Sequence, residues 1–177
     1  MGFMATGEII RPTGHRQLFR DFLERRLGPE VHSYYGDRLI SLVVFGSVAR
    51  DSSRPDSDID FLIVAQDLPQ GRMARVREFE GVELVLLRDL QDLRNQGVET
   101  SLSPIFKTPA EVDRGSPLFL DMTEDALFLY DHNQYFSDFL DRLRNRLLAQ
   151  GARRIWRGSA WYWDLKQDFR PGDQIRV

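Results

Sequence analysis

The chain has no cysteine among its 177 residues, which excludes disulfides, thiolate metal sites and cysteine nucleophiles. It also lacks any apolar run approaching the roughly 20 residues that a membrane-spanning helix needs. The N-terminal stretch "MGFMATGEIIRPTGHRQ" contains glycine and charged residues where a signal peptide would have an unbroken apolar segment. We therefore expect a cytoplasmic protein with no membrane partner.

An excess of positive charge is missing as well. The chain carries 24 basic and 27 acidic residues, a formal net charge of -3, so we expect no general nucleic-acid binding. No Ser-His-Asp order, zinc pattern, complete Walker pattern or dinucleotide fingerprint is present. No linker or internal repeat divides the chain, which predicts one domain over residues 1–177, with a C-terminal helix and aromatic tail, about 133–177, packed on it.

Apolar periodicity predicts helices and short strands in alternation. A helical stripe begins at Leu18 and is expected to stop at Gly28-Pro29. The apolar runs in residues 38–46 and 58–69 are typical of buried strands, with one helical turn after Gly46. For residues 72–96 we prefer one helix closed by Gly97, although "VELVLL" within it resembles a strand.

The second half continues the alternation. Residues 98–109 predict a third strand, placed at a sheet edge because it contains Pro104, and Thr108 is expected to cap a short helix. Residues 116–131 predict a helix followed by an extended piece, and residues 133–151 a clean amphipathic helix. The expected fold class is α/β or α+β, a small sheet flanked by helices.

The segment "FGSVARDSSRPDSDIDFLIV" is the most informative one. Alternate strand residues share a face, so Asp58 and Asp60 project together. Two adjacent carboxylates repel unless a cation compensates them, and Mg²⁺ is commonly held by one or two carboxylates plus substrate phosphates. Gly46 permits close backbone approach to a phosphate, and N–H groups at the start of a helical turn, at Ser47, favour anions. An ordinary polar turn is the alternative reading.

The order Gly46-Ser47, Arg50, then Asp58-x-Asp60 leading a strand resembles the signature of the DNA polymerase β-type nucleotidyltransferase superfamily. The match is nearest to its minimal, single-domain prokaryotic members, some of which act as antitoxins. This resemblance implies the nucleotidyltransferase fold with a small mixed sheet. It implies that Asp58 and Asp60 are catalytic and hold two Mg²⁺ ions, and that Gly46, Ser47 and Arg50 bind the nucleotide triphosphate.

The third carboxylate of the superfamily pattern is not evident. Alignment of the predicted third strand places Ser103 where an aspartate is expected. Glu83 would serve only if its segment were a strand, and Glu99 shares the face of Ser103 but lies two steps away. The sequence therefore predicts nucleotide binding but leaves catalytic turnover open.

Two further features allow more than one interpretation. Arg50 contacts phosphate or forms a surface ion pair with Asp51 or Asp56. The aromatic tail offers a stacking platform for a base, although we favour core packing that anchors the tail. The aromatic residues considered for these roles are Trp156, Trp161, Tyr162 and Trp163.

The resemblance implies a Mg²⁺-dependent transfer of a nucleotidyl group from an NTP to an acceptor hydroxyl, with release of pyrophosphate. The expected acceptor is a partner protein, such as a helical toxin. The sequence does not decide whether the protein forms a homo-oligomer. The alternative is a nucleotide-binding or partner-binding module that kept the fold and lost catalysis.

Overall fold

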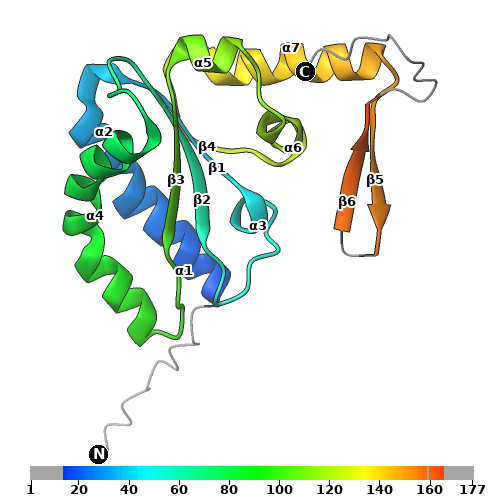
Figure 1. Ribbon diagram of the computed structural model, residues 1–177. Helices are drawn as coiled ribbons and strands as arrows, with labels where there is room; N and C mark the ends of the chain where they lie inside the picture. The colour runs from blue at the N-terminus through cyan, green and yellow to red at the C-terminus, as the bar shows by residue number, and fades with distance from the viewer. Residues whose placement is uncertain (1–13, 159, 166–177) are drawn as a thin grey trace, which may run out of the picture.

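The structure is a computed structural model that describes residues 14–158 and 160–165. Four strands form one mixed sheet in the order β3-β2-β1-β4, in which β1 pairs antiparallel with β2 and β4, and β2 pairs parallel with β3 (Figure 1). The strands are β1 Leu39–Phe45, β2 Ile59–Ala65, β3 Leu102–Lys107 and β4 Leu127–Asp131. A separate hairpin joins β5 Arg153–Arg157 to β6 Ala160–Asp164. The expected mixed sheet flanked by helices is confirmed.

Helices cover both faces of the sheet. The α-helices are α1 His15–Phe22, α2 Gly28–Tyr35, α3 Gly46–Ala49, α4 Arg72–Asn95, α5 Pro109–Asp113, α6 Leu118–Asp125 and α7 Tyr135–Ala149. Shorter helical segments are η1 Leu23–Leu27, η2 Gly36–Arg38 and η3 His132–Gln134. Among the helices of the described ranges, none is both long and apolar enough to cross a membrane.

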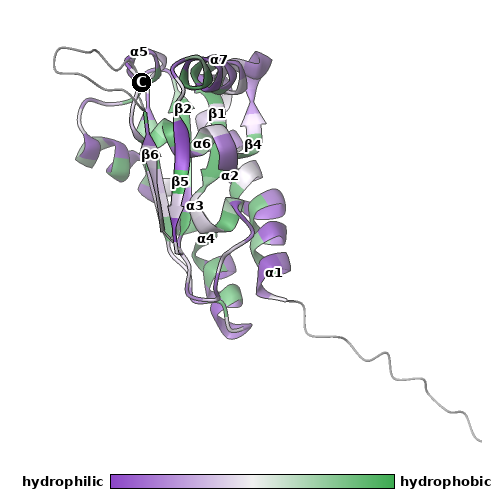
Figure 2. Ribbon diagram, turned by 90° about the vertical axis from the view of Figure 1, so that its right-hand side faces the viewer, coloured by the Kyte–Doolittle hydropathy of each residue, from purple (hydrophilic) through white to green (hydrophobic). Residues whose placement is uncertain are grey.

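Two apolar clusters divide the molecule, because alternate residues of each strand point to opposite faces. Phe61 and Ile63 of β2 pack with α1, α2 and α4, whereas Leu62 and Val64 pack with α5, α6 and α7. Asp60 alternates with Phe61 and is therefore on the face of α6 and α7. Figures 1 and 2 show α3 and the hairpin on this same side of the sheet.

The predicted helix stop at Gly28-Pro29 was wrong, because the helix continues to Tyr35. The segment Leu23–Leu27 forms a π-helix in which the Gly28 N–H donates to the Leu23 carbonyl. This wider turn places Pro29 in the first turn of α2. Proline is tolerated there because the helix does not need an N–H donor at that position.

The predictions for residues 72–109 are confirmed. Residues 72–95 form one helix, β3 is an edge strand that contains Pro104, and Thr108 caps α5. The Thr108 hydroxyl accepts from the Glu111 N–H, while the Glu111 carboxylate accepts from the Thr108 N–H, a reciprocal capping box. This cap fixes the exit of β3 from the sheet.

Candidate functional site

The glycine-serine element and the two aspartates meet at one end of the sheet. Phe45, the last residue of β1, pairs with Asp60 near the start of β2, and Gly46 follows directly. Gly46 has φ of +74°, and a Cβ there would lie 2.7 Å from Asp60 Oδ2. Only glycine therefore allows the backbone to pass this close to the carboxylate.

Each aspartate has a serine neighbour on β3 or just before it. Ser101 Oγ donates to Asp58 Oδ1 at 2.6 Å. Ser103 is the register partner of Asp60 in the parallel β2–β3 pair. The predicted position of Ser103 opposite the carboxylates is thus seen, whereas Ser101 was missed. The sequence feature that could have identified Ser101 is the Ser-x-Ser spacing before and within β3, which matches the Asp-x-Asp spacing at the start of β2.

The environment of Asp60 opposes its ionisation. Burial raises the pKa of Asp60 above its ordinary value, and the Ser103 hydroxyl works in the opposite direction. The nearby charge of Asp58 raises this pKa further, and the positive charge of Arg50 lowers it. The pair is therefore a site with unbalanced negative charge, which a cation would relieve.

Neither glutamate supplies a third carboxylate. Glu83 is on α4, so its helical assignment is confirmed, and burial raises its pKa. Glu99 precedes β3, and its carboxylate lies 3.7 Å from the Arg94 guanidinium on an exposed surface. Within residues 14–158 and 160–165, no three or more His, Cys, Asp or Glu side chains gather as a metal cluster.

The donor set still fits one hard cation. Two carboxylates on one strand face, with a serine hydroxyl beside each, present oxygen ligands only, the type that Mg²⁺ prefers. Because two carboxylates leave most of an octahedral shell unfilled, water or substrate phosphate would have to complete it.

Arg50 forms neither of the ion pairs considered from the sequence. Asp51 pairs with Arg16, and Asp56 pairs with Arg54. The Arg50 guanidinium instead lies over the Trp161 ring, with Cζ 4.5 Å from the ring centroid. The C-terminal hairpin therefore contacts the end of α3, a long-range contact that sequence reasoning missed.

The aromatic side chains of the tail have two kinds of environment, packed and exposed. Trp163 packs against the α6–α7 cluster, and the indole N–H groups of Trp161 and Trp163 both donate to Asp121 Oδ1 on α6, at 2.8 and 2.9 Å. The expectation of core packing was wrong for Trp156 and Tyr162, which are 54% and 44% exposed. Tyr162 is on the hairpin face opposite to Trp161, and a two-stranded hairpin has no second layer to bury that face. Trp156 shares the face of Trp161 and contacts Trp161 and Arg154, but it is itself left more than half exposed. Residues 166–177 of the predicted tail lie outside the described residues.

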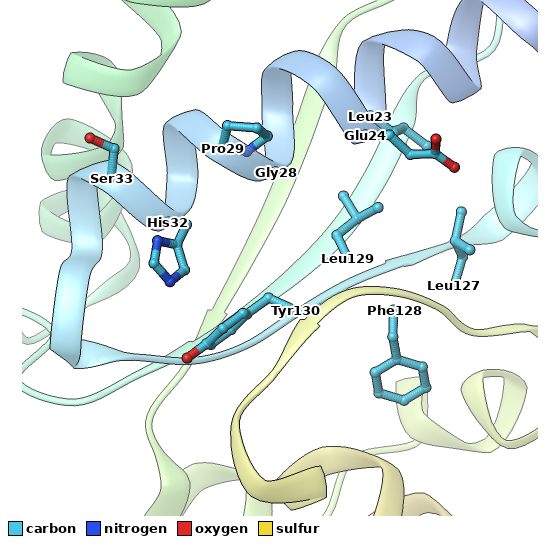
Figure 3. Close-up of a pocket in the computed structure, with 10 residues that line it drawn as sticks. All are labelled: Leu23, Glu24, Gly28, Pro29, His32, Ser33, Leu127, Phe128, Leu129 and Tyr130. Atoms are coloured by element: carbon cyan, nitrogen blue, oxygen red, sulfur yellow. The ribbon is translucent and has the colours of Figure 1, made fainter.

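A groove of about 480 Å³ lies elsewhere, between η1, α2 and the free edge of β4. Figure 3 shows Leu127, His32 and Tyr130 among its lining residues. None of the site residues expected from the sequence lines it, and Glu24 is its single acidic side chain. Its composition does not match a metal-nucleotide site.

Comparison with known proteins agrees with the motif. A family model described as a nucleotidyltransferase domain matches residues 24–115. A Methanocaldococcus jannaschii protein, whose name suggests a protein adenylyltransferase, is 31% identical over 114 residues, covering 62% of this chain and 71% of that protein.

Two solved structures are more distant. A Shewanella oneidensis complex described as a tri-AMPylated HEPN toxin with its MNT antitoxin is 16% identical with a TM-score of 0.41, covering 76% of this chain and 90% of that one. A toxin-antitoxin structure with AMP-PNP is 14% identical with a TM-score of 0.42, covering 70% and 92%. The family match spans just over half of the chain and includes both the glycine-serine element and the aspartates. The chain therefore belongs to the nucleotidyltransferase domain family, and its relatives support an enzyme of the EC 2.7.7 type.

Proposed function

We propose that the chain is a Mg²⁺-dependent protein adenylyltransferase, which moves AMP from ATP to a hydroxyl of a partner protein. The observation that carries this proposal is the approach of Gly46 to the Asp58–Asp60 face. The choice of AMP and of a protein acceptor is supported by the name of the 31% identical relative.

Asp58 and Asp60 would hold Mg²⁺, with the Ser101 and Ser103 hydroxyls orienting their carboxylates. Bound there, Mg²⁺ would supply Lewis-acid stabilisation of charge on the triphosphate and the acceptor oxygen. Gly46 gives the phosphates access to the backbone N–H groups at the start of α3, and Ser47 adds a hydroxyl. Arg50 contributes positive charge beside Asp60.

The reaction in this proposal is a displacement at the α-phosphorus. The acceptor oxygen forms a bond to that phosphorus, the bond to the bridging oxygen breaks, and pyrophosphate leaves with the electron pair. The acceptor proton passes to solvent. Negative charge grows on the leaving group, and Arg50 and the α3 N–H groups are the protein's own groups suited to stabilise it.

The alternative function is a nucleotide-binding or partner-binding module without turnover. Ser103 at the register position opposite Asp60, with no glutamate beside it, is the observation in its favour. A hydroxyl is a weaker Mg²⁺ ligand than a carboxylate, so the second metal would be poorly held.

Transfer of a labelled nucleotide distinguishes the adenylyltransferase from the module without turnover. The chain, Mg²⁺ and each α-³²P-labelled NTP are incubated with extract of the expressing cells, beside an Asp58→Asn/Asp60→Asn variant. Label from ATP on a protein band, with wild type only, supports adenylyl transfer. Label in the RNA fraction would reassign the acceptor, and binding without any label would favour the module.

A further inference from the structure

The C-terminal hairpin has one face rich in aromatic and cationic side chains. Directly paired residues of an antiparallel ladder share a face. Trp156 pairs with Trp161, and Arg154 pairs with Trp163, so these four side chains project together. All three tryptophans of the chain are in this set.

Three residues of this face, Trp161, Trp163 and Arg154, contact α6, whereas Trp156 is 54% exposed. Both indole N–H groups, of Trp161 and Trp163, donate to Asp121, and Arg154 pairs with Asp125 at the end of α6. Figure 1 shows the hairpin beside α3 and α6 rather than over the α1–α4 face. Trp161 is thus fixed at its nitrogen, and its ring contacts Trp156, Arg154 and Arg50, of which Arg50 has its Cζ 4.5 Å from the ring centroid and Arg154 5.4 Å.

Arg50 is held without using its hydrogen-bonding edge. Within the described part of the chain, its guanidinium makes no side-chain hydrogen bond and no ion pair, although it lies over Trp161. A guanidinium that stacks by its plane keeps its N–H groups free for an oxyanion. Arg50 directly follows α3, and its backbone N–H donates to the carbonyl of Gly46, so the guanidinium belongs to the short segment that contains the proposed triphosphate position.

We propose that Trp161 is a positioning residue of the nucleotide site, which orients the Arg50 guanidinium toward the phosphates. This inference rests on the proposed function. Trp161 and Asp121 lie outside residues 24–115, the part matched to the family model. The proposed nucleotide site therefore includes a residue beyond the segment that the family model matches.

The test is calorimetric titration of Mg·ATP into four folded variants. Trp161→Leu should weaken binding about fivefold, the expected size of one partly exposed cation–π contact. Trp161→Phe keeps a ring under Arg50 and should stay within about twofold of wild type. Trp163→Phe is the matched control, because it loses the same Asp121 bond but no Arg50 contact. Melting curves check that each variant is folded.

A double-mutant cycle shows whether Trp161 acts through Arg50. In an Arg50→Ala background, Trp161→Leu should cause no further loss of affinity. Additive losses, or an equal loss in Trp163→Phe, would overturn the inference and leave Trp161 a hairpin anchor. Wild-type binding with an unaffected Trp161→Leu would also overturn it while sparing the proposed function. A folded wild type that binds no nucleotide would overturn both.

The same experiment has an optical readout. Since all three tryptophans share one face of the hairpin, the tryptophan fluorescence of the protein reports the environment of that face. Mg·ATP should change the wild-type emission and should change it much less in Arg50→Ala. An identical response in both would contradict the coupling.

Discussion

At the scale of single residues, the site depends on the close approach of Gly46 to Asp60. A Cβ at position 46 would meet Asp60 Oδ2 at 2.7 Å, and the backbone φ of +74° is itself unfavourable for other residues. Both effects act where the metal and phosphates are expected. The glycine is thus needed for the site more than for the fold.

Gly46→Ala should lower nucleotidyl transfer about 100-fold or more, because the displaced carboxylate would no longer face the proposed Mg²⁺ position. The matched control is Gly97→Ala, which shares a positive φ of +83° but has no atom within 4 Å of the added Cβ. Both variants should lose about 1 kcal/mol of unfolding free energy. Equal activity in the two variants would contradict the role given to Gly46.

Ser103 is the residue through which the third-ligand question can be tested. Ser103→Asp adds a carboxylate opposite Asp60, so it should lower the melting temperature in EDTA through repulsion and recover it in Mg²⁺. Ser103→Asn, nearly isosteric and uncharged, is the control and should show no such Mg²⁺ dependence. A Ser103→Asp variant that Mg²⁺ does not stabilise would place Ser103 away from the metal.

At the scale of elements, an ion pair joins α4 to the exit of β3. Arg75 donates to both carboxylate oxygens of Glu111, at 2.7 and 3.1 Å, and the side chains are 12% and 23% exposed. The Arg75 guanidinium lowers the pKa of Glu111 to about 2, below its ordinary 4.5. This contribution to stability is complete above about pH 4.5 and is lost as the pH falls toward 2.

Glu111→Gln should cost about 2 kcal/mol of unfolding free energy at neutral pH, because it removes the charge but keeps a side chain suited to the capping box. Urea denaturation at a series of pH values measures the difference from wild type. We expect it to be constant at neutral pH and to shrink below about pH 4.5. A difference that grows on acidification would contradict the assignment.

The hairpin depends on Asp121, which accepts both indole N–H bonds. Asp121→Asn removes the negative charge and should loosen the hairpin while leaving the sheet intact. Amide hydrogen exchange should then accelerate about tenfold in residues 153–157 and 160–164 and stay unchanged in β1 and β2. Unchanged exchange in the hairpin would mean that other contacts hold it.

At the scale of the whole molecule, patterns among neighbouring residues predicted the helices and strands that depend on one short segment of the sequence. The strands, the long helix α4 and the α5 cap follow from periodicity and capping residues in neighbouring positions. The Gly46–Asp60 site could be predicted because its parts lie within one hairpin-like stretch of chain. The family model matches residues 24–115, a segment that includes Gly46, Asp58 and Asp60.

The rest could not be predicted because it depends on contacts between distant residues. Ser101 with Asp58 is a separation of 43 residues, and Trp161 with Asp121 one of 40. No single window of sequence contains either pair. The continuation through Pro29 was missed since a π-helical turn has no sequence signature as clear as a Gly-Pro pair.

We propose that the Asp58–Asp60 end of the sheet binds a magnesium nucleotide. The direct measurement is calorimetric titration of ATP, GTP, CTP and UTP in Mg²⁺, for wild type and for Asp58→Asn/Asp60→Asn. We expect wild type to bind ATP, and we expect this binding to be lost in the double variant and in EDTA. Equal binding by a folded double variant, or no binding of any nucleotide by wild type, would contradict it.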